Sequence, residues 1–173
     1  IGFYKINNKK KFNYNYIKKR MKNLKITNLK SKKLLSDKVS AAASIIAKDK
    51  KIRKIVYNFQ KKCAYDYPKK YNGSCLDGRD ITYKIVPDAD FKFFITASLK
   101  TRAKRRYLEL KKLKNNITFK EVLKSVKLRD KNDYNRKISP LTSKYSMLIN
   151  SENLSKKACF LKIKKIMDRK IKN

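Results

Sequence analysis

Short apolar runs alternate with helical stripes along the second half of the chain, and this alternation constrains the fold more than any other feature. The run FKFFITAS, residues 91–98, is aromatic and β-branched as buried strands are, and its Ser98 can cap a helix that follows directly. A second short strand is predicted at SMLIN, residues 146–150. Strands that alternate with helices predict a parallel α/β layer fold.

The helices around these strands are predicted from the spacing of apolar residues. The helix after Ser98 spaces four of them on one face: Leu99, Ala103, Leu110 and Leu113. Thr118 and Glu121 form a capping box, and the apolar residues after it follow the i, i+3, i+4, i+7 pattern of a further helix. The last helix, from about Leu154, carries one apolar stripe: Cys159, Ile163, Ile166 and Met167.

The first half of the chain changes character near residue 36. Residues 1–35 alternate Lys or Asn with Ile, Phe and Tyr, which favours short strands in a small sheet and leaves disorder open. Residues 37–67 contain no Gly or Pro and place apolar residues approximately on one helical face, with a break expected near Asp49. We therefore predict two parts, residues 1–36 and residues 37–173.

Composition excludes several classes of protein. No apolar run approaches the roughly 20 residues of a membrane span and no signal peptide is visible, so a soluble, cytoplasmic protein is expected. The three cysteines are far apart and suit neither a disulfide framework nor a zinc site. Histidine is absent, which excludes every mechanism that needs an imidazole base.

The net charge is +36, and two explanations of it stay open. Basic residues neutralise nucleic-acid phosphates, so weak, incidental binding to RNA is one expectation. The abundance of Lys, Asn, Ile and Tyr is also typical of a chain translated from A/T-rich codons. Under that explanation the charge is largely a solvated coat.

The nine arginines are more informative than the lysines. An arginine that persists in a lysine-rich chain suggests a need for a planar, bidentate fork, which an ammonium group cannot supply. Seven of the nine lie between residues 53 and 136: Arg53, Arg79, Arg102, Arg105, Arg106, Arg129 and Arg136. We predict that this region holds anionic groups, with chance clustering as the alternative.

The stretch NGSCLDGRDITYK, residues 72–84, resembles a degraded phosphate-binding loop because Gly73 and Gly78 have the G-x-x-x-x-G spacing. Such a loop needs a strand before its first glycine and a long helix after its last residues. Neither is predicted here, so we reject that interpretation. We expect instead a short strand at SCL, a turn at Gly78, and Arg79 with Asp80 projecting into a cleft beyond the strand.

Four segments together resemble the bacterial cytidylate kinases, the (d)CMP kinases of the nucleoside monophosphate kinase superfamily: AAASIIAKDKKIRKIVYNFQ, LDGRDI, VPDADFKFFITASLKTRAKRRYLEL and LRDKNDYNRKISPL. The resemblance runs from about Val39 to the end of the chain. It implies a P-loop kinase-like parallel sheet with flanking helices. It also implies that residues 1–36 are the remainder of a β-rich or partly disordered monophosphate-binding insert, that residues 37–173 form the kinase core, and that a lid lies around residues 105–136.

The resemblance also implies roles for individual residues. The implied substrate-binding set is Ser44, Arg53, Arg79, Asp80, Arg129, Asp133 and Arg136. Within it, Ser44, Arg53 and Asp80 match residues that read the cytosine edge. Arg129 and Asp133 match residues near the sugar. The implied catalytic residues are Arg79, Arg129 and Arg136, of which Arg79 and Arg136 match phosphate-contacting arginines. The arginine-rich helix before the lid is matched by Arg102, Arg105 and Arg106.

Each of these residues has a simpler explanation when it is taken alone. Ser44 could be a small packing residue among alanines. Arg129 with Asp133 could be an exposed helical ion pair, and Arg105 with Arg106 a solvated face. The motifs taken together carry the kinase interpretation, because phosphoryl transfer asks a protein mainly for alignment and charge compensation.

The family's phosphate loop and first strand have no counterpart among the 173 residues. We therefore expect an N-terminally truncated (d)CMP kinase that is inactive alone. The complete enzyme would transfer the γ-phosphate of ATP to CMP or dCMP with Mg²⁺, and no residue of this chain is predicted to bind the metal. We expect a monomer that does not bind membranes. The alternatives are a basic RNA-binding protein or an inactive remnant with a kinase-derived fold.

Overall fold

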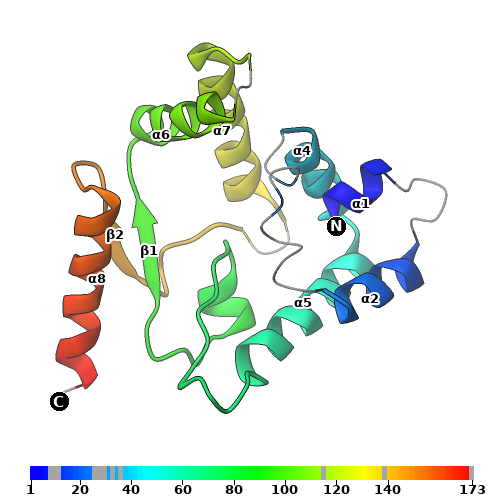
Figure 1. The fold of residues 1–173 in the computed structure, drawn as a ribbon, viewed down its shortest axis with the longest axis horizontal. Helices are drawn as coiled ribbons and strands as arrows, with labels where there is room; N and C mark the ends of the chain where they lie inside the picture. Colours follow the sequence, from blue (N-terminus) through cyan, green and yellow to red (C-terminus); the bar gives the residue numbers. More distant parts are fainter. Residues whose placement is uncertain are drawn as a thin grey trace. The chain divides into compact units, whose positions relative to one another are not determined.

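The computed structural model describes residues 1–7, 13–24, 31, 34, 37–113, 116–137 and 140–171. These residues form two compact units, residues 1–75 and residues 76–173, and each unit is described by itself. Figure 1 shows their helices and strands. None of the helices in the described ranges is long and apolar enough to cross a membrane.

The first unit is helical. It contains α1 (Gly2–Asn7), α2 (Tyr14–Lys22), α4 (Asp37–Ile46) and α5 (Lys50–Tyr65). The prediction of short strands near the N-terminus is therefore wrong for residues 2–7 and 14–22. Asn13 caps α2 by accepting a hydrogen bond from the Tyr16 amide (2.8 Å), and α2 then buries Ile17 in the unit's core. The alternating pattern was misleading because residues such as Tyr14 are exposed rather than facing one side of a sheet.

The predicted break near Asp49 is confirmed. The Asp49 carboxylate accepts hydrogen bonds from the amides of Lys51 and Ile52 (2.8 and 3.0 Å), so it ends the turn after α4 and begins α5. Ile46 and Ile52 pack on Ile17 across this break. Helix α1 contacts α4 and α2 contacts α5, so these helices belong to one compact unit that ends at residue 75. The assignment of residues 1–36 to a monophosphate-binding insert stays a prediction.

The second unit contains the sheet. Strands β1 (Phe93–Thr96) and β2 (Met147–Asn150) run parallel, with Phe93 opposite Met147 and Thr96 opposite Asn150. The helices are α6 (Leu99–Lys112), α7 (Phe119–Asn135) and α8 (Lys156–Ile171). This order confirms the predicted α/β class with a small parallel sheet and flanking helices. The expected burial of the first strand is only partial, since Ile95 is exposed.

The segment SCL does not form the predicted strand, and residues 73–77 have no regular structure. A single π-helical turn, Ile81–Ile85, follows Asp80 and buries both of its isoleucines. Tyr83 within this turn donates a hydrogen bond to the Pro140 carbonyl (2.5 Å). The segment that carries Arg79 and Asp80 is therefore held by side-chain burial rather than by strand pairing.

Helix α6 begins shortly after β1 and packs against α7 (Figure 1). Ala103 and Leu110 of α6 and Val122 of α7 are buried, and Tyr107 of α6 meets Phe119 of α7 edge to face. The predicted capping box is present, with the Thr118 hydroxyl accepting from the Glu121 amide and the Glu121 carboxylate accepting from the Thr118 amide. The predicted cap of α6 by Ser98 is also present.

Candidate substrate-binding site

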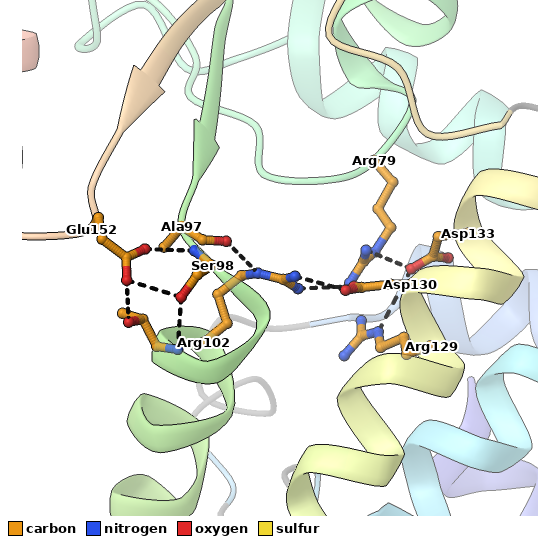
Figure 2. A network of polar contacts seen from close by, with 9 residues as sticks. Arg79, Ala97, Ser98, Arg102, Arg129, Asp130, Asp133 and Glu152 are labelled. Carbon is orange, nitrogen blue, oxygen red and sulfur yellow. Dashed lines mark hydrogen bonds and ion pairs between the residues drawn. The ribbon is translucent and has the colours of Figure 1, made fainter.

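Three arginines converge on one carboxylate in the second unit. Arg79 lies 2.5 Å from Asp133, Arg129 lies 3.9 Å from it and Arg136 lies 3.8 Å from it, measured between side-chain nitrogen and oxygen atoms. Arg79 precedes the π-helical turn, whereas Arg129 and Asp133 belong to the C-terminal half of α7 (Figure 2). Arg136 is the C-cap of the same helix. We call these four residues the arginine cluster. The structure therefore brings together four of the seven residues predicted to bind substrate.

The arginine cluster has a surplus of positive charge. Three guanidinium groups surround one carboxylate, and the Asp133 side chain is only 15% exposed. Burial and the neighbouring guanidinium of Arg129 lower the pKa of Arg79 below its usual value, although Asp133 opposes this shift. Arginine stays protonated in proteins, so the arginine cluster keeps its positive charge. Binding of a further anion would lower the electrostatic energy of the cluster.

A second acid, Asp130, lies one turn before Asp133 on α7 and was missed by the sequence prediction. It accepts two hydrogen bonds from the fork of Arg102, at 2.9 and 2.7 Å, and the same guanidinium donates to the Ala97 carbonyl at 2.9 Å. Figure 2 shows Arg102 between the end of β1 and α7. The hydrogen bonds that Arg102 donates to Asp130 raise the pKa of Arg102. The scarcity of acidic residues, 13 against 49 basic ones, was a sequence signal that Asp130 has a role, but it did not indicate the partner.

A third acid, Glu152, ties the loop after β2 to the start of α6. Its carboxylate accepts hydrogen bonds from the Thr101 hydroxyl and from the amide and hydroxyl of Ser98 (Figure 2). These bonds lower the pKa of Glu152, with the Thr101 hydroxyl contributing most. Glu152 was also missed by the sequence prediction, since its partners lie more than 50 residues away along the chain.

The predicted lid arginines divide into different environments in the structure. Arg105 donates to the Ser151 hydroxyl (3.0 Å) and carbonyl (2.6 Å), so it holds the loop after β2 against α6. Arg106 pairs with Glu109 on the same helix at 2.8 Å. Arg105 is exposed, as the simpler explanation of a solvated face expects, but it also bonds to the loop after β2.

The residues predicted to read cytosine lie elsewhere in the chain. Ser44 is an exposed residue of α4, so the simpler explanation of a packing residue does not describe it. Arg53, in the first turn of α5, donates to the Ala47 carbonyl at 3.3 Å. Asp80 is half-buried directly before the π-helical turn and next to Arg79 of the arginine cluster. Ser44 and Arg53 belong to the first unit and Asp80 to the second.

Comparison with known proteins identifies the family. The sequence model of the cytidylate kinase family matches residues 4–169. A cytidylate kinase from Bartonella tribocorum is 42% identical over 128 residues, which are 73% of this chain and 58% of that protein. One from Clostridium botulinum is 40% identical over 137 residues, 79% of this chain and 59% of that protein. A third, from Mesomycoplasma hyopneumoniae, is 36% identical over 152 residues, 87% of this chain and 63% of that protein.

The chain thus spans about three fifths of the length of the curated relatives it matches. The family match covers both compact units and includes every residue of the arginine cluster. The resemblance noted in the sequence is confirmed: the chain belongs to the cytidylate kinase family.

Proposed function

We propose that the chain binds CMP or dCMP as part of a cytidylate kinase. In the proposed reaction, the γ-phosphoryl group of ATP is transferred to this nucleotide. The convergence of Arg79, Arg129 and Arg136 on Asp133 carries this proposal. A nucleotide monophosphate near neutral pH carries almost two negative charges, which matches the surplus of two positive charges in the arginine cluster. Membership of the family supplies the substrate class.

The proposed mechanism assigns alignment and charge compensation to the chain's own residues. The three arginines would hold the oxygens of the monophosphate and offset the charge that moves onto them during transfer. Asp133 would keep the three guanidinium groups gathered, so that little reorganisation is needed when the nucleotide binds. Asp80 would accept hydrogen bonds from the cytosine edge through its carboxylate. For Ser44 and Arg53, whose side chains supply a hydroxyl and a guanidinium, a role in reading cytosine rests on the family resemblance alone.

ATP and Mg²⁺ are part of the proposed reaction, but we assign them no residues here. The 173 residues contain no G-x-x-x-x-G-K-[ST] sequence. We therefore propose that these residues alone bind CMP without transferring a phosphoryl group. A coupled assay tests this point: rapid CMP-dependent formation of ADP by the 173-residue chain would contradict it.

CMP binding itself is tested by protection against thermal unfolding. A ligand at about 100 times its dissociation constant stabilises the folded state by about 2.7 kcal/mol, and we expect CMP to raise Tm accordingly. Asp80→Ala and Arg129→Ala should lose this protection while keeping a folded circular dichroism spectrum. Equal protection of both variants, or no protection of the original chain, would contradict the proposal.

Polyanion binding is the competing function, because the net charge is +36. It predicts binding to single-stranded RNA that weakens steeply with salt, with a log-log slope of about 0.7 per phosphate contact, and that is indifferent to CMP. A filter-binding titration with added CMP separates the two functions. Competition by CMP would favour the kinase proposal, and indifference to CMP would favour polyanion binding.

A further inference from the structure

Arg102 occupies the junction between the sheet and the helix that carries most of the arginine cluster. Its Nε donates to the carbonyl of Ala97, the residue after β1, at 2.9 Å. Its two terminal nitrogens grip both carboxylate oxygens of Asp130 at 2.9 and 2.7 Å. A bidentate fork fixes both distance and direction, unlike a single hydrogen bond. Arg102 thus connects the end of a strand to one defined point on α7.

Val122, near the N-terminus of α7, is the only buried residue of this helix. Phe119, also at that end, meets Tyr107 of α6 edge to face, so apolar contact with α6 is made by the N-terminal half. Arg129 and Asp133 lie beyond that apolar contact, on the part held by polar contacts. Besides the arginine cluster, those contacts include the Leu141 amide bound to the Asp133 carbonyl at 2.8 Å. In the part of the chain that the structure describes, the C-terminal half of α7 is therefore held by polar contacts and buries no side chain.

Asp130 and Asp133 are three residues apart, so their side chains lie on the same side of the helix. Asp133 lies about 4.5 Å further along the helix axis than Asp130. When Asp130 is held at the end of the strand, the rotation of α7 about its axis and its position along that axis are therefore fixed at Asp133 as well. From these contacts we propose that Arg102 and Asp130 are positioning residues. They set where α7 presents Arg129 and Asp133 to the nucleotide, and Arg102 does not itself bind the phosphate. This inference rests on the proposed function for its ligand.

Direct binding and positioning predict opposite effects for one substitution. Asp130→Asn removes a negative charge that faces Arg79, and it frees the Arg102 guanidinium. If Arg102 contacted the phosphate, this variant would bind CMP as well as the original chain or better. If Arg102 acts by positioning, the variant loses the bidentate pair between Arg102 and Asp130 and binds CMP more weakly. This weakening is expected even though the substitution makes the net charge of the site more positive.

The experiment measures the dissociation constant of CMP by isothermal titration at a temperature well below Tm. We expect Arg102→Gln and Asp130→Asn each to weaken binding about tenfold, as the loss of hydrogen bonds to a charged group implies. The double variant should be no weaker than either single variant. Two controls remove matched charges outside the network, Lys104→Gln on α6 and Asp168→Asn on α8, and should stay within about twofold.

Amide hydrogen exchange gives a second readout that needs no ligand. Both variants should speed exchange at residues 129–135, while exchange in α8 stays unchanged. Unchanged or tighter CMP binding by Asp130→Asn, or unchanged exchange at residues 129–135, would overturn the inference. If the original chain binds no CMP, the proposed function fails, and the exchange rates alone then decide whether Arg102 and Asp130 position α7.

Discussion

Acidic residues organise the second unit because they are scarce. The chain has 13 acidic residues against 49 basic ones, so most basic side chains have no acidic partner and remain solvated. Each buried or bridging acid therefore determines which few basic or polar groups are held in place. Asp133 gathers three arginines, Asp130 orients one, and Glu152 receives three hydrogen bonds from the start of α6. Removing one such acid therefore changes several contacts together. Substituting an acid consequently tests the structure of the second unit more sharply than substituting a lysine.

Glu152 should make the stability of the second unit depend on pH. Its pKa in the folded protein is lowered below the usual value of 4.5 by hydrogen bonds from Thr101 and Ser98. A lowered folded pKa means that the stabilisation is fully present above the unfolded pKa and is lost as pH falls through the folded pKa. Urea unfolding midpoints measured from pH 7 to pH 3 should fall less steeply on acidification for Glu152→Gln than for the original chain.

The control for this measurement is Glu109→Gln, which removes a carboxylate from an exposed pair with Arg106 on the same helix. Its pH profile should parallel that of the original chain. If Glu152→Gln also gives a parallel profile, the hydrogen bonds to Glu152 do not favour its charged form.

At the scale of elements, caps and close contacts explain where helices begin and how they meet. Thr118 begins α7 through a reciprocal capping box with Glu121. We expect Thr118→Ala to lower the free energy of unfolding by about 1 kcal/mol, because it leaves amides of the first turn without a partner. Thr118→Ser keeps the hydroxyl and should lose much less in the same urea titration. Equal losses for both variants would show that the cap does not stabilise α7.

Gly2 permits the close approach of α1 to α4. A Cβ atom at Gly2 would lie 2.9 Å from the Ala43 amide nitrogen and still closer to the Val39 carbonyl oxygen. These are backbone atoms, so the helices must separate, and Gly2→Ala should cost about 1–3 kcal/mol of unfolding free energy. Gly73 has open space around it, and Gly73→Ala is the matched control. Chemical denaturation that shows no difference between the two variants would contradict this packing.

The elements that the sequence predicted best are those with local signals. The strand FKFFITAS, the Ser98 cap and the Thr118–Glu121 capping box depend on neighbouring residues, and all three are present. The N-terminal segment failed because alternating Tyr, Asn and Lys imitate a strand, whereas the buried residues of that unit follow helical spacing. The strand expected at SCL is absent: residues 73–77 have no regular structure, and the Ser74 hydroxyl donates a hydrogen bond to the Ala64 carbonyl at 2.7 Å.

At the scale of the whole molecule, the family and all four residues of the arginine cluster could be predicted from ordered motifs, since arginines are informative where most cations are lysines. Asp130 and Glu152 could not be predicted, because their partners lie 28 and more than 50 residues away. A single sequence does not show which distant groups meet. The positions of Ser44 and Arg53 in the first unit leave their role in reading cytosine as a proposal.

The most direct test of the account is the ³¹P NMR resonance of CMP titrated with the 173-residue chain. Contact between the phosphate and the arginine cluster should shift and broaden the resonance at moderate salt. Arg129→Gln should abolish the change. Lys131→Gln, which removes one exposed charge from the same helix, should preserve it. A resonance that stays unperturbed, or that responds equally to both substitutions, would contradict a nucleotide site built around Asp133.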